Sequence, residues 1–387
     1  MTSYIPIQNI KKGTVLQRTA FYKFHADRGA KFVDFAGWEM PISFGSVIDE
    51  HKQVREKGGL FDVSHMGRLK LTGRHVRRLL ERVLTRYITD MADKTCRYAL
   101  VCNEQGGVMD DVILYKFPSH YMLVVNASNR EKIVNHLHQV AKDENMIAKI
   151  EDQTESTAMV ALQGPRVMEK IGEFSREVPT LKRYTFCEKN LLILKMTISR
   201  TGYTGEDGVE VIMGSMMAEK AIKLLVKESP NAEENVMGSV GLAARDTLRL
   251  EAAMPLYGHE LSETIDPLSA GLQFAVNLNK DEMDRGEKFI GQDALKTILA
   301  DGIKQKRVGI KFDGKRTPRQ DMAVTVDGNK VGFVTSGCLS PSLGYPIAMA
   351  YVDVAQSEVG TKLAVDLGNG KSVDGEVVAL PFYKKPQ

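Results

Sequence analysis

The pattern of hydrophobic and polar residues changes period several times along the first half of the chain. Residues 46–57 and 74–84 place apolar side chains at helical spacing, so each is predicted to form an amphipathic helix. Residues 97–103 and 108–117 resemble two strands around a Gly-containing turn, which predicts a hairpin. The next elements are a strand and then a helix, at residues 121–127 and 130–143. Because strands follow one another before the helix, the run is predicted to be antiparallel and the fold class α+β.

The second half continues with mixed elements and then changes character. Strands are predicted at 157–163, 191–201 and 209–213, helices at 166–174, 218–228 and 239–252, and a loop at 229–235. From about residue 305, strand-like segments are separated by Gly and Asp turns. This pattern predicts a small all-β C-terminal domain, a barrel or a jelly roll, with its boundary near residues 296–306.

Composition narrows the class of protein. The 387 residues are 43% hydrophobic and 26% charged, which is typical of a soluble globular chain and excludes a disordered chain or a coiled-coil rod. The length indicates two or three domains. The net charge of +3 comes from basic residues spread along the chain, so it does not support a nucleic-acid partner. No stretch approaches 18 uncharged apolar residues, so no membrane helix is expected.

The cysteines and the N-terminus bear on the compartment. None of the four cysteines lies in a C-x-x-C pair or a zinc-type cluster, so we expect them to be reduced, which favours a reducing compartment. The N-terminus has no apolar signal segment, and its first acidic residue is Asp27. We favour a basic bacterial N-terminus, which predicts a cytoplasmic location. The alternative is a weak mitochondrial transit segment, which would place the protein in the mitochondrial matrix.

Several common catalytic motifs have no counterpart in the sequence. It lacks a Walker phosphate loop, H-E-x-x-H, G-x-S-x-G and a strand-following G-x-G-x-x-G. Nucleotide hydrolysis, zinc peptidase and Rossmann dehydrogenase functions are therefore disfavoured, and no metal is expected.

Two adjacent carboxylates, Asp110 and Asp111, lie inside an apolar strand and must point to opposite faces. One can be solvated, and the other must face the interior or a cleft. Burying a carboxylate costs free energy unless it is paired, so a carboxylate at this position suggests a functional role. A turn aspartate that caps the Gly106–Gly107 loop is an equally good interpretation.

A second polar constellation is SRTGYTGEDGVEV, in which glycines allow tight turns and Glu210 alternates with Val209 and Val211. A carboxylate there could accept two N–H groups from an amidine-like ligand such as a pterin. A surface hairpin with solvated acids is the alternative.

In the helix GLAARDTLRLEA, Arg245 and Arg249 form either a salt-bridged face or a clamp for a carboxylate.

Seven segments occur together in the order seen in one family. They are GAKFVDFAGWEMP, LFDVSHMG, NEQGGVMDD, SRTGYTGEDG, GLAARDTLRLEA, TSGCLSPSLGYPIAMAYV and PFYKK. On these motifs the chain closely resembles the glycine cleavage system T-protein (aminomethyltransferase) family, from about residue 16 to its end.

The resemblance implies a three-domain cloverleaf around a central folate cavity. The expected domains are residues 1–65 plus 155–255 (folate-binding), 66–154 plus 256–295 (an antiparallel sheet that carries Asp111) and 300–387 (a β-barrel or jelly roll). It also implies the reaction: the methylene carbon of aminomethyl-lipoyl H-protein passes to tetrahydrofolate as co-substrate. Ammonia, 5,10-methylenetetrahydrofolate and dihydrolipoyl H-protein result. The chain is expected to be a monomer that docks the lipoyl-bearing H-protein transiently, with no nucleic-acid or membrane partner.

The same resemblance assigns site residues. It implies that Asp111 is the essential catalytic aspartate, that Glu210 binds the pterin and that Arg245 lies beside it. The other implied folate contacts are Tyr98, Tyr115, Asn126, Tyr184, Tyr203 and Tyr383. Asp111 and Tyr115 then share one strand face, and Asp110 faces away as a solvated or structural residue.

Departures from the family pattern are few. Ala243 stands where members often have Gly, and Phe274 where they often have Trp. These changes affect the expected affinity, not the reaction. The alternative functions are a folate-dependent demethylase of the same fold and a non-catalytic folate-binding factor for iron–sulfur assembly. The presence of Asp111, Glu210 and Arg245 argues against the non-catalytic factor.

Overall fold

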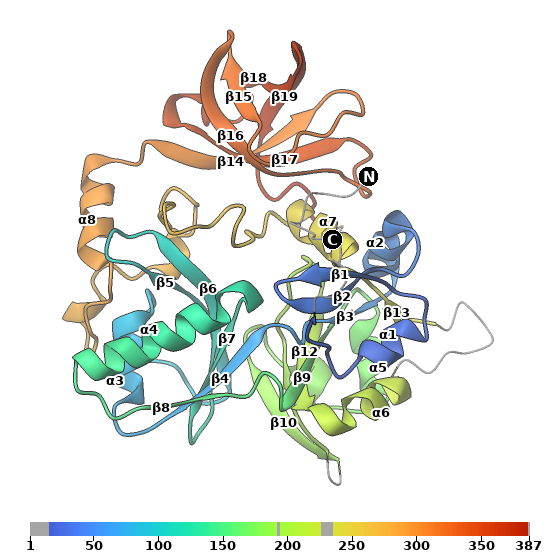
Figure 1. The fold of residues 1–387 in the computed structure, drawn as a ribbon, viewed down its shortest axis with the longest axis vertical. Coiled ribbons are helices and arrows are strands. Elements are labelled where there is room, and N and C mark those ends of the chain that lie inside the picture. The colour runs from blue at the N-terminus through green and yellow to red at the C-terminus, as the bar shows by residue number, and fades with distance from the viewer. Residues whose placement is uncertain (1–14, 192–193, 226–234, 386–387) are drawn as a thin grey trace.

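Three large β-structures are arranged around the middle of the molecule, and helices lie against them (Figure 1). The computed structural model describes residues 15–191, 194–225 and 235–385. In Figure 1 the C-terminal barrel lies at the top, and the two other large sheets lie below it, side by side. This mixture of antiparallel sheets and helices confirms the predicted α+β class.

A six-stranded sheet has the order β10-β11-β12-β9-β3-β13, and only the β13–β3 pair is parallel. Its strands are β3 (Gly59–Asp62), β9 (Thr157–Gln163), β10 (Phe186–Leu191), β11 (Leu194–Ser199), β12 (Gly208–Gly214) and β13 (Gly238–Ser239). The helices packed around it are α1 (Tyr22–Ala26), α2 (Val47–Glu56), α5 (Val167–Gly172), α6 (Ser215–Leu225) and α7 (Leu242–Glu251). A short hairpin of β1 (Lys31–Phe35) and β2 (Trp38–Ser43) contacts α7. The predicted helix at 46–57 is confirmed as α2, whose first turn is capped by the side chain of Ser46.

A five-stranded antiparallel sheet has the order β5-β6-β7-β4-β8. Its strands are β4 (Gly67–Thr72), β5 (Thr95–Cys102), β6 (Val108–Lys116), β7 (Tyr121–Val125) and β8 (Lys149–Asp152). The apolar faces of α3 (Val76–Val83) and α4 (Arg130–Asp143) bury one face of this sheet. The predicted hairpin, third strand and following helix are all confirmed.

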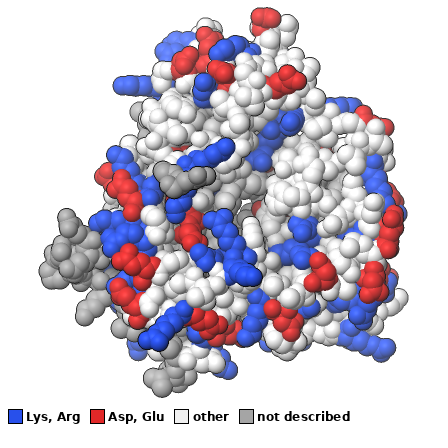
Figure 2. Space-filling view, turned by 180° about the vertical axis from the view of Figure 1, so that it is seen from behind, with Lys and Arg blue, Asp and Glu red and all other residues white. Residues whose placement is uncertain are grey.

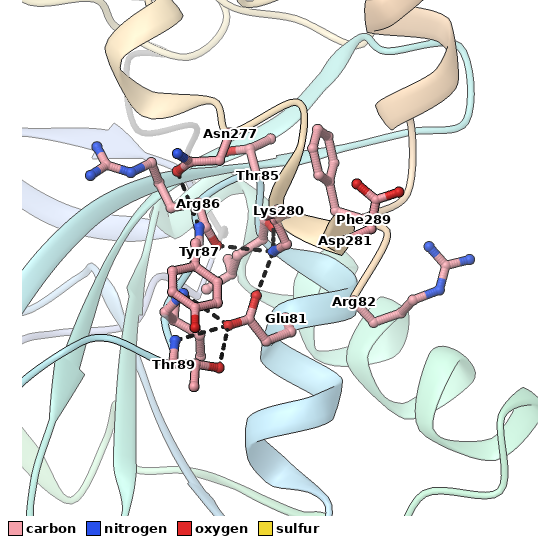
Figure 3. Close-up of polar contacts among 12 residues, drawn as sticks. Glu81, Arg82, Thr85, Arg86, Tyr87, Thr89, Asn277, Lys280, Asp281 and Phe289 are labelled. Atoms are coloured by element: carbon pink, nitrogen blue, oxygen red, sulfur yellow. Dashed lines mark hydrogen bonds and ion pairs between the residues drawn. The ribbon is translucent and has the colours of Figure 1, made fainter. Parts of the chain in front are cut away.

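A buried ion pair ties α3 to a distant part of the chain (Figure 3). Glu81 on α3 and Lys280 are both fully buried, with 2.9 Å between the Oε2 and Nζ atoms. Lys280 also donates to the carbonyl oxygens of Leu84 (2.7 Å) and Arg86 (2.9 Å). The other carboxylate oxygen of Glu81 accepts from the backbone N–H and the hydroxyl of Thr89. The pair therefore fixes the segment between α3 and β5 against the 280 region.

The C-terminal part closes into a barrel with the strand order β14-β17-β16-β15-β18-β19, which confirms the predicted all-β domain. Its strands are β14 (Gln305–Phe312), β15 (Ala323–Val326), β16 (Asn329–Leu339), β17 (Pro346–Asp353), β18 (Lys362–Gly368) and β19 (Lys371–Val378). Pairing of β14 with β19 closes the barrel around its own apolar core. Helix α8 (Gln292–Asp301) precedes the first strand.

Two predicted elements differ from the structure. The single strand expected at 191–201 is the second half of a hairpin, in which β10 pairs antiparallel with β11. Because β10 lies at the edge of the sheet, it carries polar residues such as Lys189. Its sequence therefore lacks the hydrophobic pattern from which a strand would be predicted. The helix expected from residue 239 begins at Leu242, because Gly238–Ser239 pairs with β3. Gly241 lies at the junction, where an added Cβ would meet the carbonyl oxygen of Ile42 at 2.2 Å.

Some sequence predictions fall partly outside the described residues. The end of the helix predicted at 218–228 and most of the loop predicted at 229–235 lie there. The four cysteines are free and buried, as expected for reduced thiols. Within the described ranges, no helix is both long and apolar enough to span a membrane.

Candidate active site

A cavity of about 310 Å³ lies where the two large sheets meet α7 and the 254–257 segment. Its size is in the range of small-molecule sites. Seven of the nine predicted site residues line it: Tyr98, Asp111, Asn126, Tyr184, Tyr203, Glu210 and Arg245. Figure 2 views the molecule from behind and shows a hollow near the centre of that face, with Lys and Arg side chains beside it.

Asp111 projects from β6 into this cavity, and both of its carboxylate oxygens accept hydrogen bonds. The Tyr98 hydroxyl donates to Oδ2 at 3.1 Å, and the side-chain amide of Asn126 donates to Oδ1 at 2.7 Å. Burial raises the pKa of Asp111, and the hydrogen bonds from Asn126 and Tyr98 oppose that rise. The result is a fixed carboxylate in a cavity that is mostly apolar.

Asp110 points to the opposite face of β6 and is fully buried, so the option that it is solvated is wrong and the structural option holds. Its carboxylate accepts from the backbone N–H of Asn126 (3.1 Å), the Asn126 amide (2.8 Å) and the Asn129 amide (2.7 Å). Burial and the charge of Asp111 raise the pKa of Asp110 to about 7. Asn126 thus contacts both aspartates, one on each face of the strand.

Glu210 and Arg245 bring opposite charges to another part of the cavity wall. Glu210 lies on β12, and its neighbours Val209 and Val211 point into the core on the other face, as the alternation predicted. Arg245 lies on α7 with its guanidinium carbon 4.8 Å from the ring centroid of Tyr203. Its Nη1 is buried without a hydrogen-bond partner in the described structure. Burial raises the pKa of Glu210 and lowers that of Arg245, and each charge opposes the shift of the other.

Arg249 separates from Arg245 in role, although the two lie one helical turn apart. Its guanidinium pairs with Asp246 at 2.8 Å and with Glu260 at 2.7 Å, and both partners are buried. It also donates to the hydroxyl of Ser336 in the barrel. Both arginines line the cavity, but the salt-bridge interpretation holds for Arg249, whereas Nη1 of Arg245 has no hydrogen-bond partner in the described structure.

Aromatic side chains form flat walls of the cavity. The rings of Tyr98 and Phe274 are stacked, with centroids 6.0 Å apart and 23° between their planes. Tyr203 donates its hydroxyl to the carbonyl oxygen of Pro255 at 2.5 Å. Tyr184 has a backbone φ of 60°, a left-handed conformation that is unusual for a residue with a side chain, and it is 50% exposed.

Two predicted site residues lie outside the cavity lining. Tyr115 shares the strand face of Asp111, but its ring is buried in the core and its hydroxyl lies 2.9 Å from that of Ser199. The backbone N–H of Tyr383 donates to the carbonyl oxygen of Glu251. Its ring lies 4.1 Å from the guanidinium carbon of Arg55. Their roles toward a ligand remain predictions.

His65 lines the cavity but was not singled out from the sequence. It is buried, and its Nδ1 has no hydrogen-bond partner in the described structure. Burial lowers its pKa to about 4, with Arg245 and Arg68 adding to the shift against Asp62, so the ring is neutral. The only signal for it was its place inside the motif LFDVSHMG.

The cavity does not have the side chains of a metal site. No group of three or more His, Cys, Asp or Glu residues with metal-binding geometry occurs among residues 15–191, 194–225 and 235–385. Its polar groups instead suit a ligand with both donors and acceptors.

Comparison with known proteins identifies the class as an aminomethyltransferase. Residues 21–280 match the GCVT N-terminal domain, and residues 305–384 match the glycine cleavage T-protein C-terminal barrel domain. The chain is 41% identical to an aminomethyltransferase of Rubrobacter xylanophilus, over 97% of this chain and 96% of the relative. It is 42% identical to one from Symbiobacterium thermophilum, over 96% and 98% of the two chains.

A solved structure agrees with these matches. The aminomethyltransferase T of the glycine cleavage system from Bartonella henselae superposes with a TM-score of 0.87, at 32% identity, over 96% of this chain and 99% of that one. The chain therefore belongs to the glycine cleavage T-protein family. Its function is that of a transferase in the glycine cleavage system, and the comparisons favour neither the demethylase nor the iron–sulfur assembly factor.

Proposed function

We propose that the central cavity binds tetrahydrofolate and that the enzyme delivers to it the one-carbon unit carried by the lipoyl arm of H-protein. The substrate carbon is bonded to one nitrogen and one sulfur. In the reaction, N5 and N10 of tetrahydrofolate each form a bond to that carbon, and the carbon–nitrogen and carbon–sulfur bonds break. The two protons lost from N5 and N10 balance those gained by ammonia and by the lipoyl thiol. No oxidant or metal is required by this balance.

Glu210 and Arg245 would orient the pterin ring. The carboxylate of Glu210 can accept from the N3–H and the 2-amino group, and the unpartnered Nη1 of Arg245 can donate to a ring acceptor. The walls formed by Tyr98, Phe274 and Tyr203 suit a flat heterocycle.

Asp111 would act on the reacting carbon and nitrogens. The observation that carries the proposal is its carboxylate, held from both sides by Tyr98 and Asn126 inside the cavity. Fixed in this way, it can stabilise positive charge that develops at N5 or the methylene carbon, and it can accept a proton. Stabilisation of this kind is effective because the group need not reorganise during the reaction.

The test is turnover of two donors by the purified protein. We expect formation of 5,10-methylenetetrahydrofolate and ammonia with aminomethyl-lipoyl H-protein and tetrahydrofolate. We expect no demethylation of dimethylsulfoniopropionate under the same conditions. Methyl transfer from the sulfonium donor, with none from the aminomethyl donor, would contradict the proposal.

The partner, assembly and location follow from the same proposal. We expect a monomer that binds H-protein transiently and works in the bacterial cytoplasm; the relatives named above come from bacteria. Sedimentation of the protein alone and with H-protein tests the first two points. A stable homo-oligomer or a long-lived complex would contradict them.

A further inference from the structure

Three hydroxyl groups lie end to end behind Glu210. The Tyr115 hydroxyl is 2.9 Å from the Ser199 hydroxyl, and the Ser199 hydroxyl is 2.8 Å from that of Thr201. The Thr201 hydroxyl donates to Oε2 of Glu210 at 2.5 Å. The described structure thus has a continuous hydrogen-bonded chain from the core to the cavity.

Strand pairing sets the geometry of this chain. Ser199 is the cross-strand partner of Glu210 in the β11–β12 pair, and Thr201 follows two residues later. Tyr115 comes from β6 in the other sheet, so the chain crosses from one sheet to the other. All four side chains are buried, which leaves water little access to compete for these hydrogen bonds.

The direction of the protons follows from the acceptor at the end of the chain. An ionised carboxylate can only accept hydrogen bonds, so the Thr201 hydroxyl donates its single proton to Glu210. The contact between Thr201 and Ser199 at 2.8 Å then requires Ser199 to donate, and it is shorter than the alternative bond from Ser199 to the backbone carbonyl oxygen of Glu210 at 3.3 Å. Ser199 in turn accepts from Tyr115, so every donor points toward the carboxylate and each bond polarises the next.

We propose that Tyr115, Ser199 and Thr201 are positioning residues that hold the Glu210 carboxylate ionised and in one orientation, with one lone pair of Oε2 used by Thr201 and the remaining lone pairs of the two oxygens left for the ligand. This rests on the proposed function, in which Glu210 binds the pterin. It also gives Tyr115 a task that does not require contact with folate.

The charged and titratable groups around Glu210 are few. Arg245 on α7 supports the ionised form, and burial acts against it. Burial raises the pKa values of Cys96 on β5 and Tyr115 on β6, and the nearby charge of Glu210 adds to both shifts, so both groups stay neutral. The hydroxyl chain is therefore the main support for the carboxylate besides Arg245.

The experiment measures the dissociation constant of tetrahydrofolate by anaerobic calorimetry in four variants. Tyr115→Phe removes one hydroxyl at the far end of the chain and leaves the ring in the core. We expect it to weaken binding roughly threefold, and Thr201→Val roughly tenfold, in line with hydrogen bonds to a charged group. Thr201→Ser keeps the donor and should restore most of the affinity. Tyr121→Phe, on the half-buried tyrosine of β7, is the matched control and should bind like wild type.

Thr201 itself lines the cavity, so its loss could weaken binding through a direct contact with the ligand. Double variants with Glu210→Gln distinguish such a contact from an effect that acts through Glu210. In a Glu210→Gln background, Tyr115→Phe and Thr201→Val should cause no further loss, since they act through the carboxylate. The affinity of Thr201→Val should also begin to fall at a higher pH than that of wild type as the solution is acidified. The kcat at saturating tetrahydrofolate should change less than KM.

The outcomes distinguish the two proposals. If Glu210→Gln binds tetrahydrofolate as well as wild type does, the assignment of Glu210 under the proposed function is wrong. If Glu210→Gln binds weakly but Tyr115→Phe matches Tyr121→Phe, the hydroxyl chain has no positioning role. Additive losses in the double variants would overturn it as well, because Thr201 and Tyr115 would then act independently of Glu210.

Discussion

Asn126 contacts both aspartates of the DD pair, and this single side chain explains why each has a different role. Adjacent positions on a strand predict opposite faces, and that part was available from the sequence. The bridging amide was not, because β7 reaches the pair only through strand pairing. Likewise, the alternation predicted the direction of Glu210, but nothing local showed that Nη1 of Arg245 would lack a hydrogen-bond partner among the described residues, or that Arg249 would pair with two carboxylates.

Asp111→Asn should keep the fold and much of the tetrahydrofolate binding but remove most turnover. The substitution keeps the shape and deletes the charge that faces the reacting atoms. A loss of roughly 10²–10⁴ in kcat is the scale for one positioned acid–base group. Steady-state rates with aminomethyl-lipoyl H-protein give the measurement, and a near-wild-type kcat would contradict the assignment.

Asp110→Asn should have the opposite effect, a loss of stability with a much smaller loss of turnover. Its carboxylate accepts three N–H groups from Asn126 and Asn129, and an asparagine would turn one acceptor into a donor that faces them. We expect a loss of about 1–3 kcal/mol in stability. The melting temperature should fall, whereas the kcat of the folded fraction should fall far less than in Asp111→Asn. A normal melting temperature with lost turnover would mean that the two roles are reversed.

Helices with strong periodicity, such as α2, α3 and α4, were predictable because their local pattern agrees with their burial. Edge strands such as β10 were not, since only the sheet explains them. The fully buried Glu81 on α3 is a further case, because its partner Lys280 comes from far along the chain. The segment that Lys280 anchors includes Phe274, whose carbonyl oxygen accepts from Arg86, so this ion pair also supports one wall of the cavity.

Lys280→Met should lower stability by about 3–5 kcal/mol, because it leaves the Glu81 carboxylate buried without its cation. The double variant Glu81→Gln with Lys280→Met should recover part of that loss. Urea unfolding of the three proteins at pH 7 measures both effects. Equal stability of wild type and Lys280→Met would show that the pair has no net role.

The pH dependence of this pair has a defined sign. Burial lowers the pKa of Lys280 to about 8, although Glu81 opposes the shift. Between pH 8 and the unfolded value of about 10.4, the native state loses a proton that the unfolded state keeps. The stability of wild type relative to the double variant Glu81→Gln with Lys280→Met should therefore rise with pH in that window. A relative stability that falls above pH 8 would contradict the lowered pKa.

At the scale of the whole molecule, Glu251 at the end of α7 joins parts that are distant in sequence. It accepts from Arg55 on α2 (2.8 Å) and from Ser340 (2.5 Å) beside the barrel. Although burial opposes it, hydrogen bonds and charge from His51, Ser340 and Arg55 lower its pKa to about 2. Tyr383 stacks on the same Arg55, which places the C-terminal tail in this junction. The division into three domains at the boundaries expected from the family resemblance remains a prediction.

Tyr383→Ala tests what the tail does. Because the ring lies on Arg55 outside the cavity lining, we expect a loss of about 1 kcal/mol from the cation–π contact and a lower melting temperature. Tetrahydrofolate affinity in the folded protein should change little. If affinity falls at an unchanged melting temperature, the ring reaches the ligand, as the family resemblance implies.

The strand order of the six-stranded sheet also bears on how the chain is made. All five strands of the β5-β6-β7-β4-β8 sheet lie in sequence between β3 and its two neighbours, β9 and β13. During synthesis on the ribosome, the five-stranded sheet can therefore form before β9 and β13 have been made. Until then, both edges of β3 are unpaired. Leu60 and Phe61, which are buried in the finished protein, are then exposed on a nascent chain with open strand edges. Synthesis that pauses between β8 and β9 should prolong this state and increase the demand for ribosome-associated chaperones.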